Sequence, residues 1–134
     1  MSSVVIDTHT LIWYLEQSPK ISPTAIDILD QATHDDFPIF IASITLVEIV
    51  YLAEKKRLGA FSVEQFLTDL ATPESPFSIV PLTLEVVQSL QRIPKIQVPD
   101  MPDRIIAATA HSLNIPLITC DHKILACSAI QTIW

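Results

Sequence analysis

Short apolar segments alternate with amphipathic segments along this chain, and the alternation limits the folds open to it. Apolar runs of strand length occupy residues 4–6, 38–42, 77–82 and 116–119, with a further candidate at 131–134. Between them, apolar residues recur at helical spacing, as at Leu11, Ile12 and Leu15. Buried strands that alternate with helices are typical of a parallel sheet with helices on both faces. We therefore expect an α/β fold: one three-layer α/β/α domain with a central parallel sheet of four to five strands.

The expected helices have recognisable ends. Ser22 followed by Pro23 is typical of a helix start, because serine caps the helix and proline suits its first turn. Gly59, the single glycine, stands where the helix after residues 38–42 needs a left-handed terminator. Further helices are predicted from Ser62 and over residues 8–16, 83–90, 104–113 and 122–126.

Size and composition favour one soluble domain with a partner. A chain of 134 residues buries enough surface to fold alone, so residues 1–134 are treated as a single domain. Hydrophobic residues make up 49% and charged residues only 17%, which leaves apolar surface to cover, and we expect a homodimer. The apolar segment at residues 37–53 contains Glu48 and is better explained by a strand followed by a helix than by a membrane-spanning helix.

Charge and cysteine content limit the partners and the compartment. The net charge of −7 argues against a protein that coats nucleic acid, although an enzyme that grips a few phosphates through metal ions remains open. Cys120 and Cys127 give neither a disulfide framework nor a zinc signature. Asp7 and His9 interrupt the first apolar stretch, so no signal peptide is expected. We expect a cytoplasmic protein with no membrane association.

Four acidic residues stand at the ends of the apolar segments. Asp7 follows residues 4–6, Asp121 follows 116–119, Glu48 lies one turn into the helix after 38–42, and Asp103 opens a further apolar helix. Ligands of parallel sheets bind at the carboxyl ends of the strands, although the pattern does not dictate that Asp103 lies there. Two carboxylates at 4 Å repel by about 4 kcal/mol at an effective dielectric near 20, so a cluster must protonate or bind a cation.

Oxygen ligands select hard ions, so the predicted cofactor is Mg²⁺ or Mn²⁺. A divalent ion beside a polyanionic substrate indicates phosphodiester chemistry. Arg104, next to Asp103, is the candidate for binding a substrate phosphate.

Each acid also has a purely structural interpretation. Asp7 and Asp121 would each cap the helix that follows. Thr45 and Glu48 fit a capping box, with threonine as the cap and glutamate reaching back. Asp103 in a first helical turn would complement the helix dipole. These interpretations are sound one at a time, but they treat as independent four residues that the expected fold can bring together.

Four ordered segments resemble the PIN-domain nucleases, most closely the VapC-type toxins of bacterial toxin–antitoxin pairs. They are Val-Val-Ile-Asp7-Thr-His-Thr-Leu-Ile-Trp, Ala-Ser-Ile-Thr-Leu-Val-Glu48-Ile, Pro-Asp-Met-Pro-Asp103-Arg-Ile-Ile-Ala-Ala-Thr-Ala and Leu-Ile-Thr119-Cys-Asp121. The resemblance runs the length of the chain, and its specificity lies in the ordered set. It implies that Asp7, Glu48, Asp103 and Asp121 are the catalytic and metal-site acids and that Thr119 supplies a supporting hydroxyl. Asp100 adds a second aspartate near Asp103.

The predicted function is a metal-dependent endoribonuclease that hydrolyses RNA phosphodiester bonds. The resemblance implies a toxin that a cognate antitoxin protein silences. Two alternatives stay open: a metal-dependent phosphatase-like enzyme, and a non-catalytic interaction module with a vestigial acidic site. An aspartyl phosphatase would carry Asp-x-Asp at the first strand, where this chain has Thr8 and His9 after Asp7.

Overall fold

The computed structural model describes residues 2–59 and 61–134. Its strands form one parallel sheet in the order β3-β2-β1-β4-β5. They are β1 (Val4–Ile6), β2 (Ile39–Ala42), β3 (Phe77–Val80), β4 (Leu117–Ile118) and β5 (Thr132–Ile133). The chain starts at the centre, builds β2 and β3 on one side, and then crosses to build β4 and β5 on the other. The connections therefore diverge between β1 and β4, the kind of switch point at which α/β sheets bind ligands.

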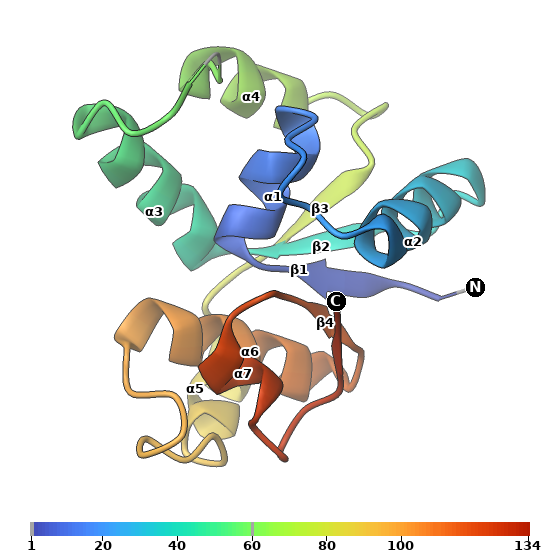
Figure 1. Cartoon of the computed structure of the whole chain (residues 1–134). Helices are drawn as coiled ribbons and strands as arrows, with labels where there is room; N and C mark the ends of the chain where they lie inside the picture. Colours follow the sequence, from blue (N-terminus) through green and yellow to red (C-terminus); the bar gives the residue numbers. More distant parts are fainter. Residues whose placement is uncertain (1, 60) are drawn as a thin grey trace.

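Helices cover both faces of this sheet, as predicted (Figure 1). The helices α1, α2, α3 and α4 lie on one face, and α5, α6 and α7 lie on the other. Their bounds are α1 (Thr8–Leu15), α2 (Pro23–His34), α3 (Ser43–Glu54), α4 (Val63–Leu70), α5 (Leu84–Leu90), α6 (Met101–Leu113) and α7 (His122–Leu125). The three-layer α/β/α architecture and the fifth strand are confirmed.

Strand alternation divides the core into two clusters. Val4 and Ile6 of β1 point to the cluster shared with α1 and α2, whereas Val5 between them points to the cluster shared with α6. All three are buried, as a central strand covered on both faces requires. On the α6 side, Ala107, Ala108 and Ala110 are buried, and their small side chains let that helix lie close to the sheet.

Three local expectations were wrong. The helix α3 ends at Glu54, and Lys56 rather than Gly59 takes the left-handed conformation beyond it, with φ 54°. A Cβ at Gly59 would meet Oε2 of Glu16 at 3.2 Å, a tight contact with the end of a side chain that can move. Thr45 does not cap α3, because the helix already begins at Ser43 with Ala42 at the cap position and no side-chain cap bond.

The third difference is the start of α6, which begins at Met101 rather than at residue 104, with Asp100 at the cap position and a proline in its first turn. Asp103 is therefore inside the first turn. No helix among residues 2–59 and 61–134 is long and apolar enough to cross a membrane.

Candidate metal centre at the carboxyl edge of the sheet

Asp7 is the buried anchor of the carboxyl edge. It ends β1 and caps α1, where its Oδ1 accepts a hydrogen bond of 3.0 Å from the backbone N–H of Thr10. Its Oδ2 accepts a bond of 2.5 Å from the hydroxyl of Thr119. The residue is only 6% exposed, and burial raises the pKa of its carboxyl, with the hydrogen bonds from Thr10 and Thr119 opposing the shift. The capping role is thus real, and it coexists with a place in the acidic cluster.

Thr119 connects Asp7 to Asp121. The strand β4 pairs with β1, and the N–H of Asp7 donates to the carbonyl of Ile118 at 3.2 Å, which fixes the two strand ends together. The buried Thr119 hydroxyl donates to Asp7 and accepts the backbone N–H of Asp121 at 3.0 Å. Asp121 also caps α7, with Oδ1 accepting bonds from the N–H groups of Lys123 and Ile124. One hydroxyl therefore contacts the carboxylate of Asp7 and the backbone of Asp121.

Glu48 is positioned by a second hydroxyl, that of Thr8. The Thr8 hydroxyl donates a bond of 2.6 Å to Oε1 of Glu48 and lies 3.2 Å from the hydroxyl of Thr45. Thr8 and Thr45 are both buried, and Glu48 is partly buried. Sequence reasoning missed Thr8 and gave Thr45 a capping role. A hydroxyl residue directly after Asp7 could have been predicted to lie near the site. No local sequence pattern, however, predicts its hydrogen bond to a glutamate forty positions away.

Asp103 completes the cluster from the opposite side of the sheet. It is half-buried in the first turn of α6. Burial, followed by the negative charges of Asp121, Glu48, Asp100 and Asp7, raises the pKa of its carboxyl to about 6. The field at Asp103 thus comes from the other three predicted acids and from Asp100, which lies exposed at the cap position of the same helix. The fold brings together the residue that the strand pattern alone did not place.

The donor set fits a hard divalent cation. All four groups are carboxylates, and burial together with the charges of the other acids raises the pKa of Asp103. Within residues 2–59 and 61–134, no three His, Cys, Asp or Glu side chains form a ready-made cage for an ion. A Mg²⁺ site needs no such cage, because this ion is usually bound through one or two carboxylates and keeps several waters.

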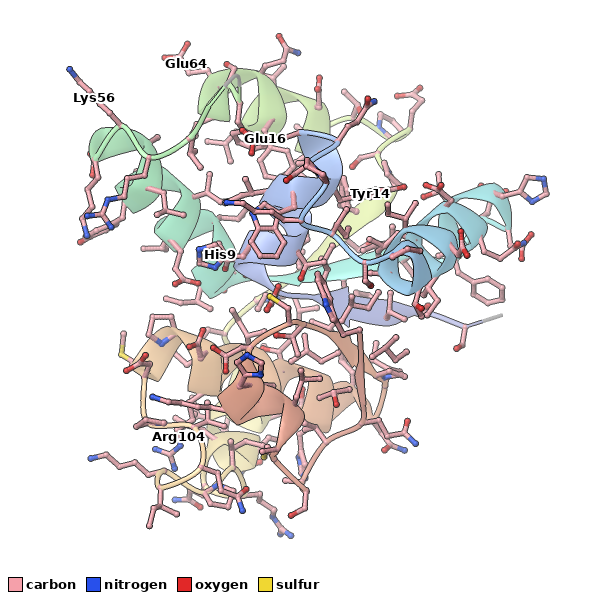
Figure 2. All side chains as sticks on the ribbon, in the orientation of Figure 1. His9, Tyr14, Glu16, Lys56, Glu64 and Arg104 are labelled. Carbon is pink, nitrogen blue, oxygen red and sulfur yellow. The ribbon has the colours of Figure 1, made fainter. Side chains whose placement is uncertain are left out.

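Arg104 is used inside the fold. Its Nε donates to the carbonyl of Ile93 at 2.9 Å, and one Nη donates to the carbonyl of Leu90 at 3.0 Å. Figure 2 shows the side chain on the α5 side of the molecule. These bonds satisfy carbonyls at the C-terminal end of α5, where a cation also complements the helix dipole. Binding of a substrate phosphate by Arg104 stays a prediction that this geometry does not favour.

Known proteins resemble this chain over most of its length. A model of the PIN domain matches residues 4–128. Ribonuclease VapC22 of Mycobacterium tuberculosis is 27% identical over 125 residues, which cover 92% of this chain and 91% of that protein. The structure of VapBC2 from Rickettsia felis bound to a promoter DNA fragment has a chain with a TM-score of 0.70 at 18% identity, covering 98% of this chain and 97% of that one. DNA-bound VapBC from Salmonella typhimurium also gives 0.70, at 20% identity and with 99% and 98% coverage.

Proposed function

This chain belongs to the PIN-domain family, and on that premise we propose that it is a metal-dependent endoribonuclease that hydrolyses RNA phosphodiester bonds. The observation that carries the proposal is that Asp7, Glu48 and Asp121 lie close enough to Asp103 for their charges to raise its pKa, at the edge of the sheet where Asp7 and Asp121 follow β1 and β4. The name of the ribonuclease from Mycobacterium tuberculosis supports the choice of RNA as the substrate.

We propose a separate role for each acid. Asp7 and Asp103 would ligate Mg²⁺ or Mn²⁺ directly, Glu48 would ligate or orient a water molecule, and Asp121 would complete the site through water. The ion would supply a water of lowered pKa and neutralise charge on the phosphoryl and leaving oxygens. Thr119 keeps Asp7 in one orientation, and Thr8 does the same for Glu48, so neither carboxylate has to be ordered when the substrate arrives.

Cleavage of RNA tests this proposal. We expect the wild-type protein to cleave a mixed RNA pool with Mg²⁺ or Mn²⁺ and to lose the activity in EDTA. Asp7→Asn should abolish most cleavage, whereas Asp69→Asn, on the exposed side of α4, should cleave like wild type. If the protein hydrolyses a phosphomonoester but leaves RNA intact, the phosphatase-like alternative is favoured. If it neither cleaves RNA nor binds the ion, a vestigial site is favoured.

We also propose that the enzyme is a toxin with a protein antitoxin, acting on RNA in the cytoplasm. Support comes from the two VapBC complexes that share its fold. Co-expression with the product of an adjacent small reading frame should yield one complex and suppress cleavage. An adjacent product that neither binds nor inhibits would contradict this role.

A homodimer is proposed on the apolar face of α3. Val47, Val50 and Tyr51 recur there at helical spacing and are 49%, 37% and 59% exposed. An uncovered apolar stripe of this kind is typical of an interface.

A further inference from the structure

Three aromatic rings form a series beside the acidic cluster. The rings of His9 and Trp13 are 6.0 Å apart between centroids and inclined at 54°, and those of Trp13 and Trp134 are 6.1 Å apart at 59°. His9 and Trp13 lie one turn apart on α1. The ammonium of Lys20 lies 5.9 Å from the centroid of Trp13. Neither the metal site nor the helix caps account for this arrangement.

The series lies at the same edge of the sheet as the acids. His9 is in the first turn of α1, the helix that Asp7 caps, and Figure 2 shows it at that end of the helix. The N–H of Thr119 donates to the carbonyl of Ile133 at 3.1 Å, so Trp134 follows β5 at the edge that carries Thr119. Figure 1 shows the C-terminus beside β4, the strand with which β5 pairs. The rings therefore approach the Asp7 side of the cluster from two elements, α1 and β5.

Packing explains only part of the series. Trp13 and Trp134 are partly buried against the core on the α1 side of the sheet. His9 and Lys20 are exposed. Packing of the two tryptophans against the core requires neither the imidazole of His9 nor the ammonium of Lys20 beside the Trp13 ring. Aromatic rings that are at least partly exposed, beside a cation, are the combination that binds single-stranded nucleic acid, because every base has a face that can stack and every phosphate carries a charge.

We propose that His9, Trp13 and Trp134 form a stacking track for the bases of single-stranded RNA, with Lys20 contacting an adjoining phosphate; the inference rests on the ribonuclease function proposed above. The net charge of −7 disfavours binding of RNA by general electrostatic attraction, and stacking on base faces supplies affinity that does not depend on charge. Lys20 disfavours a basic peptide as the occupant. Bases stacked on the track would bring a neighbouring phosphodiester over Asp7 with little dependence on base identity.

The chain has two tryptophans, and both belong to the track, so fluorescence excited at wavelengths that tyrosine does not absorb reports on these two rings. The test uses full-length Asp7→Asn protein with Mg²⁺, to prevent cleavage, titrated with oligoadenylate, oligouridylate and an abasic ribose-phosphate oligomer of equal length. We expect saturable quenching that is strongest with oligoadenylate and absent with the abasic oligomer. Equal quenching by the abasic oligomer would show charge attraction without stacking and would overturn the inference.

Substitutions in the same background separate stacking from packing. Trp13→Leu, which keeps apolar bulk, should weaken oligoadenylate binding about ten-fold, in line with the value of one stacked base, and Trp13→Phe should recover most of the loss. His9→Ala removes an exposed ring and should weaken binding severalfold at an unchanged melting temperature. Phe37→Leu, an exposed aromatic before β2 at the opposite end of the strands, is the matched control and should bind normally.

Parallel cleavage by proteins with Asp7 intact separates the two proposals. If the wild-type protein cleaves RNA while His9→Ala and Trp13→Leu leave both binding and cleavage unchanged, the track is wrong and the ribonuclease stands. If wild-type protein neither cleaves nor binds RNA, both proposals fall. Tighter quenching by an arginine-rich peptide than by oligoadenylate would assign the surface to a protein partner and overturn the inference.

Discussion

The hydroxyl of Thr119 donates a hydrogen bond of 2.5 Å to Oδ2 of Asp7, across 112 positions of sequence. The same oxygen accepts the N–H of Asp121. The bond adds a side-chain link to the backbone pairing of β1 and β4, the two strands between which the connections diverge, and it orients the Asp7 carboxylate of the acidic cluster.

Thr119→Val should damage both stability and activity. Valine has a similar shape but leaves Oδ2 of the buried Asp7 without its donor and the N–H of Asp121 without its acceptor. A buried polar group that loses its partner costs about 1–3 kcal/mol, so we expect the free energy of unfolding in urea to fall by about that amount. Thr119→Ser keeps the hydroxyl and should lose much less. Equal losses for both variants would mean that the methyl group, not the hydrogen bond, matters.

Divalent ions should stabilise the folded protein. The native state gathers four carboxylates that the unfolded chain does not, so Mg²⁺ or Mn²⁺ binds it preferentially and raises the melting temperature by mass action. At a concentration one hundred times the dissociation constant, the gain is about 2.7 kcal/mol. Asp7→Asn should remove most of it, while Asp69→Asn should not. A melting curve that millimolar Mn²⁺ leaves unchanged would contradict a metal site.

Without divalent ions, the acidic cluster should make stability fall as pH rises. Folding raises the pKa of Asp103 from 3.8 to about 6, so the folded state binds this proton more tightly than the unfolded state. The resulting stabilisation is full below pH 3.8 and is lost as pH rises through about 6. Urea unfolding in EDTA across this range should show wild type losing stability relative to Asp103→Asn, which cannot titrate. A constant difference between the two proteins at every pH would be the contrary result.

The sequence predicts the elements and three of the four acid positions for a simple reason. Parallel strands end at one edge, so residues that follow strands, such as Asp7 and Asp121, meet there wherever the strands lie in the sheet. Asp103 precedes its strand, and its place depends on the crossing from β3 to β4, which no local pattern encodes. The bond between Thr8 and Glu48 and the contact between Trp13 and Trp134 likewise join distant segments. The end of α3 was mispredicted because glycine is common in the left-handed conformation that ends helices, whereas Lys56 takes that conformation here.

The exposed stripe on α3 should mediate self-association. Val47, Val50 and Tyr51 present an apolar surface without charge at its centre, and Tyr51 is 59% exposed. We expect light scattering at tens of micromolar to give the mass of a dimer for wild type. Tyr51→Glu should give a monomer, because a charge buried at an interface without a partner is costly. Leu67→Glu, at another exposed apolar site on α4, is the control and should remain dimeric. A clean wild-type monomer would refute self-association through this face.

Isosteric amides at Asp100 and Asp103 should separate ligands from helix caps. Asparagine caps helices about as well as aspartate, so a purely structural acid tolerates the change with little loss of stability or activity. Asp100 is exposed at the cap position of α6 and makes no side-chain cap bond, so Asp100→Asn should keep most cleavage.

Asp103→Asn should behave in the opposite way. The half-buried Asp103 carboxyl feels the charges of Asp121, Glu48, Asp100 and Asp7, and removing its own charge relieves that repulsion. The metal-free variant should therefore melt at or above the wild-type temperature near neutral pH, while its cleavage of RNA with Mg²⁺ collapses. Stability and activity moving in opposite directions is the signature of a ligand, because a lost cap lowers both. If Asp100→Asn is inactive and Asp103→Asn cleaves like wild type, the third ligand is Asp100.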